Sequence, residues 1–114
     1  MKIYHNPRCS KSRETLQIIV DKGIEPQIVE YLKTPFSKKE LKKVLELLKI
    51  PAKDLIRKNE TVYKEQFKNK EFSEDEWLDV LVENPVLIER PIVVSNNKAV
   101  IGRPPENVSS LFNN

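Results

Sequence analysis

Cys9 is the single cysteine of this 114-residue chain and the side chain with the strongest potential for chemistry. It falls between an expected strand end and an expected helix start, where the first backbone N–H groups of a helix lack internal partners. Such N–H groups and the helix dipole stabilise a thiolate and lower its pKa. Most free cysteines are small buried hydrophobes, but the flanking segments 6–8 and 10–11 are polar or turn-forming. We therefore predict that Cys9 is a reactive thiolate.

His5 and two arginines are the nearest groups that can act with this thiolate. His5 lies four residues before Cys9, and Arg8 and Arg13 flank the cysteine. The histidine either makes one local hydrogen bond at a strand end or serves as an electrostatic or proton-transfer partner of Cys9. The positive charge of the arginines favours the thiolate in either case.

Three further arginines stand at element boundaries, whereas most of the positive charge of the chain is carried by lysine. They are Arg57, Arg90 and Arg103. Arginine offers a rigid fork of donors that binds tetrahedral oxyanions in bidentate fashion, although any one of the three alone could be an ordinary surface ion pair. Two of them bracket a predicted hairpin, and all three are expected to converge near the sheet end that carries Cys9. Together they predict an oxyanion site.

The spacing around Cys9 separates several thiol chemistries. A tyrosine-phosphatase-like loop needs an arginine where this chain has Thr15, and a dithiol oxidoreductase needs a second cysteine where it has Ser12. One cysteine closes no disulfide within the chain, and with one histidine it is too few for a structural zinc site. No metal site is predicted, and any redox cycle must use an external thiol.

The first third of the chain reads as a strand, a helix and a strand. Residues 1–5 form the first strand, which Asn6-Pro7 breaks. A helix over residues 10–22 and a strand over 27–32 follow, and together they make a βαβ unit. This order places Cys9 at the turn between the first strand and the helix.

The rest of the chain is helical and then returns to strands. Residues 37–84 are mainly helical, with capping-box patterns that begin at Ser37 and Ser73. Strands over 92–94 and 98–101 follow, joined by a two-residue turn at Asn96-Asn97 in which both residues must tolerate positive φ. A short helix with proline in its first turn ends the chain.

The order βα, β, several helices and then ββα is that of an α/β, thioredoxin-like fold. It predicts a mixed four-stranded sheet with a helical insertion, at about residues 37–84, between the βαβ and ββα halves. We expect residues 1–114 to form one domain, because the final hairpin needs the first strand as its neighbour.

Composition narrows the function classes further. Charged residues make up 32% and apolar residues 39%, which is ordinary for a globular protein, and no stretch is long and apolar enough to span a bilayer. The first residues lack the apolar core of a signal peptide, so a cytoplasmic location is expected. The net charge is +3, but the lysines are interleaved with Glu and Asp. Neither a nucleic-acid nor a membrane partner is predicted.

Four segments together closely resemble the glutaredoxin-dependent arsenate reductases, an ArsC-like family with a thioredoxin-like fold that is related to Spx-like regulators. The segments read YHNPRCSKSR from Tyr4, LIRKN from Leu55, RPIVV from Arg90 with an Asn-Pro pair before it, and IGRP from Ile101. They occur in the family's order, and the resemblance runs from residue 3 to about residue 110.

The resemblance implies a role for each matched residue. Cys9 would be the nucleophile that attacks arsenate, and His5 would support its thiolate. Three arginines would bind the arsenate oxygens: Arg57, Arg90 and Arg103. Pro91 matches a proline that follows a cis peptide bond in thioredoxin-like folds. No bound cofactor is implied; glutathione would be the co-substrate, and glutaredoxin would clear the mixed disulfide that remains on Cys9.

Two other functions stay open. The same fold serves Spx-like transcriptional regulators, which usually carry the C-x-x-C motif that Ser12 interrupts here. A glutathione-dependent reductase of unknown substrate, acting on another oxyanion or on none, would use the same residues.

Overall fold

The computed structural model describes residues 1–112, and the chain divides into two compact units. One unit comprises Met1–Thr34 and the chain from Arg90 onward, and the other comprises Pro35–Glu89. The helical insertion predicted at about residues 37–84 falls in the second unit, and a single domain over the whole chain stays a prediction. Within residues 1–112, no helix has the length and apolar character that a membrane span requires.

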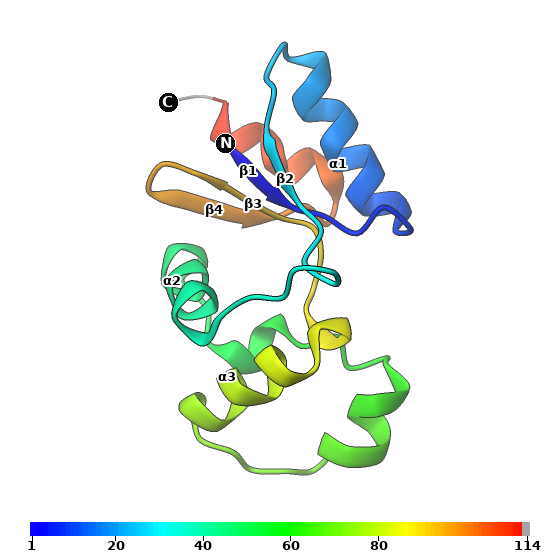
Figure 1. Cartoon of the computed structure of the whole chain (residues 1–114), viewed down its shortest axis with the longest axis vertical. Helices are drawn as coiled ribbons and strands as arrows, with labels where there is room; N and C mark the ends of the chain where they lie inside the picture. The colour runs from blue at the N-terminus through cyan, green and yellow to red at the C-terminus, as the bar shows by residue number, and fades with distance from the viewer. Residues whose placement is uncertain (113–114) are drawn as a thin grey trace. The chain divides into compact units, whose positions relative to one another are not determined.

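A four-stranded mixed sheet is the frame of the first unit (Figure 1). Its strands, in spatial order, are β2 (Gln27–Val29), β1 (Lys2–Tyr4), β3 (Ile92–Ser95) and β4 (Lys98–Ile101). β1 runs parallel to β2 and antiparallel to β3, and β3 runs antiparallel to β4. Helix α1 (Ser10–Asp21) connects the two parallel strands. The predicted α/β, thioredoxin-like fold is confirmed.

One face of this sheet carries the core of the first unit. Ile3 and Val93 are register partners on β1 and β3, so their side chains share a face. Both pack with Ile19 of α1 and with two side chains of a 3₁₀ helix over Pro105–Leu111, and all of these are at most 2% exposed. Helix α1 and the Pro105–Leu111 helix therefore cover the same face of the sheet.

The hairpin between β3 and β4 turns at Asn96 and Asn97, as predicted, because Ser95 and Lys98 are register partners. Only Asn96 has a positive φ, of 55°. The expectation of positive φ at both residues is therefore wrong. One residue in the left-handed conformation is therefore enough to close the turn between Ser95 and Lys98.

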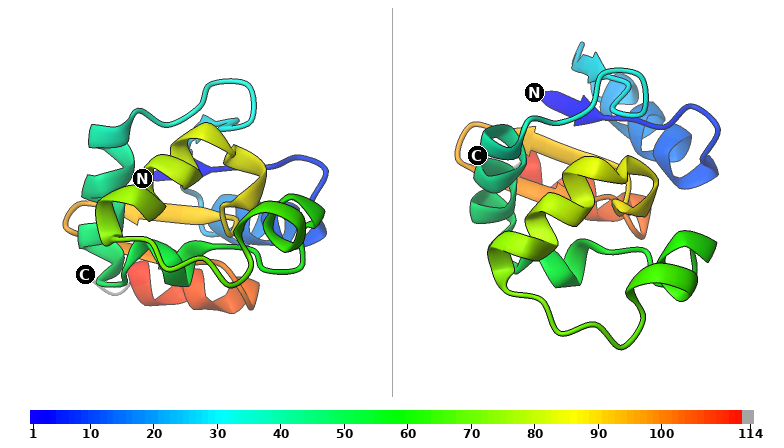
Figure 2. Two further views of the ribbon diagram at one scale, coloured as in Figure 1. Left: turned by 90° about the horizontal axis from the view of Figure 1, so that it is seen from below. Right: turned by 60° about the horizontal axis from the view of Figure 1, so that its bottom comes forward.

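The second unit is helical (Figure 2). Helices α2 (Lys38–Leu48) and α3 (Glu74–Glu83) pack against each other, and shorter turns lie at Ala52–Leu55, Tyr63–Phe67 and Pro85–Leu87. Ser37 caps α2 by accepting a hydrogen bond from the backbone N–H of Glu40. At Ser73 both halves of the predicted capping box are present, which confirms that signal.

Candidate active site

The strand register brings three segments of the first unit to one edge of the sheet. Tyr4 lies opposite Ile92, and Ile92 lies opposite Ile101. The residues after Tyr4, before Ile92 and after Ile101 must therefore leave the sheet at the same edge. These segments are residues 5–9, 90–91 and 102–103.

Cys9 is the N-cap residue of α1 and is 7% exposed. Its carbonyl accepts from the N–H of Arg13 at 3.0 Å, and its own N–H donates to the carbonyl of Asn6 at 3.0 Å. The neutral side chain makes no capping hydrogen bond. The first-turn N–H groups are thus left for a thiolate, which is a better acceptor than a thiol.

Two opposing influences act on the Cys9 thiol. Burial raises its pKa, but the backbone N–H of Ser12, the charge and hydrogen bonding of Arg90, and the backbone N–H of Lys11 together outweigh burial. The pKa of Cys9 is therefore lowered from its ordinary value. The Nε–H group of Arg90 is itself buried and has no acceptor among residues 1–112. The side chain whose charge favours the Cys9 thiolate therefore also carries a donor that is not used within the described residues.

Replacing Arg90 by Met should raise the pKa of Cys9, because the positive charge that favours the thiolate is lost. We expect alkylation of Cys9 by iodoacetamide at pH 7 to slow by about fivefold, with the midpoint of the rate–pH profile moved to higher pH. Arg8→Met is the matched control, since Arg8 is exposed and adds nothing to the lowered pKa. Equal profiles for the two variants would contradict the role of Arg90.

Arg103 joins Arg90 at this edge of the sheet. Its Nη1 donates to the carbonyl of Arg90 at 3.4 Å, and the neighbouring Gly102 N–H donates to the carbonyl of Pro91 at 2.9 Å. The Arg90–Pro91 peptide bond is cis, as the resemblance implied. The Arg103–Pro104 bond is also cis, which the sequence does not predict.

Arg57 belongs to the second unit. Its N–H donates to the carbonyl of Leu87 at 2.7 Å, next to a bridge between Ile56 and Ile88. Its guanidinium forms an ion pair with Glu60. Of the three predicted arginines, two therefore lie at the edge that carries Cys9, and the place of Arg57 at the oxyanion site stays a prediction.

His5 is buried and its ring contacts Ser12. Its Nδ1 lies 2.6 Å from Ser12 Oγ. Burial lowers the pKa of His5, the carboxylate of Glu30 raises it, and the charge of Arg13 lowers it, with a net lowering. None of the effects on the Cys9 pKa comes from His5. The support of the thiolate by His5 stays a prediction.

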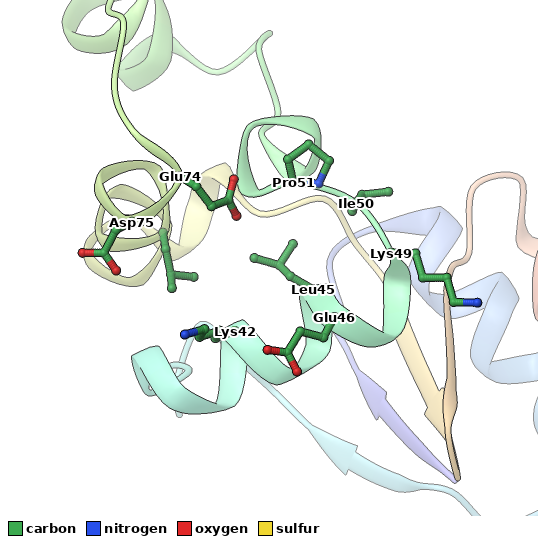
Figure 3. Close-up of a pocket in the computed structure, with 9 residues that line it drawn as sticks. Lys42, Leu45, Glu46, Lys49, Ile50, Pro51, Glu74 and Asp75 are labelled. Atoms are coloured by element: carbon green, nitrogen blue, oxygen red, sulfur yellow. The ribbon is translucent and has the colours of Figure 1, made fainter.

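A hollow in the second unit is a competing candidate for a site (Figure 3). Apolar side chains of α2, α3 and the segment between α2 and Ala52 line it, with Lys42, Glu46 and Lys49 among the charged residues. Of its carboxylates, Glu74 accepts from the backbone N–H of Ala52 at 2.9 and 3.1 Å, and Asp75 forms an ion pair with Lys38. Nothing in this hollow indicates chemistry.

Residues 4–111 match the sequence profile of the ArsC family. The chain belongs to this family. It is 44% identical to an arsenate reductase of Haemophilus influenzae, with 96% of this chain and 97% of that protein aligned. It is 50% identical to YfgD of Escherichia coli K12, an uncharacterised protein, over 97% of this chain and 95% of that one. The solved structure of an arsenate reductase from Vibrio cholerae superposes with a TM-score of 0.92 at 45% identity, covering 96% and 95% of the two chains.

Two contacts of this ArsC-family chain were not predicted from its sequence. Ser12 stands where a dithiol enzyme has its second cysteine, and its hydroxyl binds the ring of His5. Thr15 stands where a phosphatase-type loop has its arginine, and its side chain packs against Gly102. One signal was available: Ser12, Thr15 and Ile19 recur at helical spacing and are the buried residues of α1. Among residues 1–112, no three His, Cys, Asp or Glu side chains are grouped as metal ligands would be.

Proposed function

We propose that this protein is an arsenate reductase that draws its electrons from glutathione and glutaredoxin. The observation that carries the proposal is Cys9, a free cysteine at the start of α1 with a lowered pKa, beside Arg90, in a sequence without a second sulfhydryl. A thiolate in such surroundings is a nucleophile at neutral pH. Relatives named arsenate reductases align with nearly the whole chain, which supports arsenate as the substrate.

In the proposed reaction the Cys9 thiolate attacks the As(V) atom of arsenate. A sulfur–arsenic bond forms as the bond between arsenic and one hydroxyl oxygen breaks, and that hydroxyl takes a proton from the solvent and leaves as water. The sulfur of glutathione then attacks the Cys9 sulfur, and the sulfur–arsenic bond breaks with its electron pair left on arsenic. Arsenite departs with As(III), and a Cys9–glutathione mixed disulfide remains. Because the chain has no resolving cysteine, glutaredoxin would restore Cys9 by thiol–disulfide exchange.

The arginines would hold the substrate during this attack. Arg90 and Arg103 offer forked donors at the edge that carries Cys9, and guanidinium forks match the spacing of oxyanion oxygens. The buried Nε–H of Arg90, which lacks an acceptor among the described residues, supports this role. Arg57 is proposed as the third ligand from the family resemblance, and it would exchange its Glu60 partner for a substrate oxygen.

The electron source also indicates a cellular compartment. Glutathione is kept reduced in the cytosol, so we propose a cytoplasmic location for the cycle. Neither a bound cofactor nor a nucleic-acid or membrane partner is needed.

The test is a reconstitution with the purified full chain, arsenate, glutathione and glutaredoxin, with arsenite as the measured product. We expect sustained turnover only when both thiol components are present. Without glutaredoxin, mass spectrometry should find Cys9 carrying one glutathione after a single turnover. If no arsenite forms although Cys9 alkylates rapidly, the substrate is another oxyanion or none. Binding of RNA polymerase without arsenate turnover would favour the alternative function, that of an Spx-like transcriptional regulator.

A further inference from the structure

The buried hydroxyl of Ser12, three residues after Cys9, contacts two groups of the preceding loop. Ser12 is 0% exposed and lies in the first turn of α1. The backbone N–H of Asn6 donates to its Oγ at 3.0 Å, and Nδ1 of His5 lies 2.6 Å from the same oxygen. Both partners belong to the loop that leads to Cys9.

These two contacts determine where the protons are. A serine hydroxyl has one proton to donate and two lone pairs that accept. The N–H of Asn6 can only donate, so it occupies a lone pair, and Nδ1 of His5 is the acceptor that remains for the hydroxyl proton. A proton on Nδ1 would leave the buried hydroxyl proton without an acceptor among residues 1–112, which is unfavourable.

The charged groups around His5 do not reverse this assignment. The carboxylate of Glu30 favours a protonated ring, whereas burial and the guanidinium of Arg13 disfavour it, and the latter two prevail. With Nδ1 accepting from Ser12, the proton of a neutral ring must be on Nε2.

We propose that Ser12 is a positioning residue that holds His5 as the neutral, Nε2-protonated ring and ties the loop before Cys9 to the start of α1. The same residue presents its backbone N–H to the Cys9 sulfur. Ser12 thus links the histidine, the loop and the thiolate through its hydroxyl and its backbone. It does so at the position where a dithiol enzyme would carry its second cysteine.

This assignment changes the role of His5. A neutral ring adds no positive potential to the thiolate, so the cationic support comes from Arg90 and from the helix start. The Nε2–H group makes His5 a hydrogen-bond donor instead. The inference rests on the proposed function only in treating Cys9 as the reactive group, and its tests use no arsenate. They therefore separate its failure from that of the arsenate proposal.

The direct test is the ¹⁵N spectrum of the imidazole ring, which is unambiguous because the chain has one histidine. At pH 7 we expect the pattern of a neutral Nε2–H ring, with Nδ1 shifted by its hydrogen bond. Ser12→Ala should remove the hydrogen-bond shift of Nδ1, and Ser12→Thr should restore it. An imidazolium or Nδ1–H pattern in the unmodified protein would overturn the proposal, whether or not the variants fold.

A second test follows Cys9 itself. Ser12→Ala should slow alkylation of Cys9 by iodoacetamide at pH 7 by about fivefold, the effect of losing one hydrogen bond. His5→Asn should slow alkylation less than His5→Gln, because only the asparagine amide oxygen lies where it can accept from Ser12. Ser109→Ala, at an exposed serine of the Pro105–Leu111 helix that bonds neither His5 nor the loop before Cys9 in residues 1–112, is the control. Unchanged rates in both Ser12→Ala and His5→Gln would contradict the positioning role.

Discussion

Replacing Cys9 by Ser should lower kcat/KM for arsenate by about 10³-fold or more, the scale on which enzymes lose activity with their nucleophile. The hydroxyl of serine stays protonated at neutral pH, and the sequence holds no other sulfhydryl that could form the sulfur–arsenic bond. Arsenite production in the glutathione- and glutaredoxin-coupled reaction measures the loss. Robust turnover in the serine variant would rule out Cys9 as the nucleophile.

The same variant should gain, not lose, stability relative to Cys9→Ala. Cys9 occupies the N-cap of α1 without a capping hydrogen bond, and serine is among the best N-cap residues. We expect Cys9→Ser to be more stable than Cys9→Ala by about 1 kcal/mol in urea denaturation. The reactive thiol would then occupy an N-cap position of α1 at which serine gives a more stable helix. Equal stability of the two variants would show that the serine hydroxyl does not reach the first-turn N–H groups.

Gly102→Ala should strongly destabilise the protein by adding a single methyl group. A Cβ at Gly102 would lie 2.5 Å from Thr15 Oγ1, 2.9 Å from Pro91 Cγ and 3.0 Å from Thr15 Cγ2. Neither neighbour yields easily, because Thr15 is fully buried on α1 and Pro91 is a ring in a buried segment. Overpacking of this kind costs about 3 kcal/mol. Chemical denaturation would measure it.

Gly23→Ala is the matched control for Gly102→Ala. Gly23 has a φ of +79° and nothing within 4 Å of an added Cβ, so alanine there meets backbone strain alone, at about 1 kcal/mol. In the Gly102→Ala background, Thr15→Ala should recover part of the lost stability, because it removes two of the three clashing atoms. Additive losses in the double variant would mean that the two residues do not clash.

Arg103 follows Gly102 directly, so the same change should also reach the candidate active site. Arg103 donates to the carbonyl of Arg90, whose charge favours the Cys9 thiolate. A displaced β4 end would therefore slow Cys9 alkylation in Gly102→Ala but leave it unchanged in Gly23→Ala.

Much of the fold could be predicted because its signals are local. The Asn6-Pro7 break and the Ser73–Glu76 capping box act within a few residues, and α1 and α3 begin where these signals indicate. Strand lengths were less predictable: residues 27–32 were expected as a strand, but β2 covers Gln27–Val29. A strand ends where its partner stops pairing, and β1 offers only three residues to β2.

The candidate site, like the fold, has some features that local sequence predicts and others that depend on tertiary contacts. A chain with one cysteine must borrow its reducing thiol, and arginines at element boundaries can serve an oxyanion; both follow from residue types and order alone. That Arg90 lies beside Cys9, that Ser12 takes the ring of His5, and that Thr15 meets Gly102 were decided by the tertiary structure. Thr15 and Gly102 are 87 positions apart in the sequence. Such contacts depend on strand register and helix packing, and no short stretch of sequence encodes either.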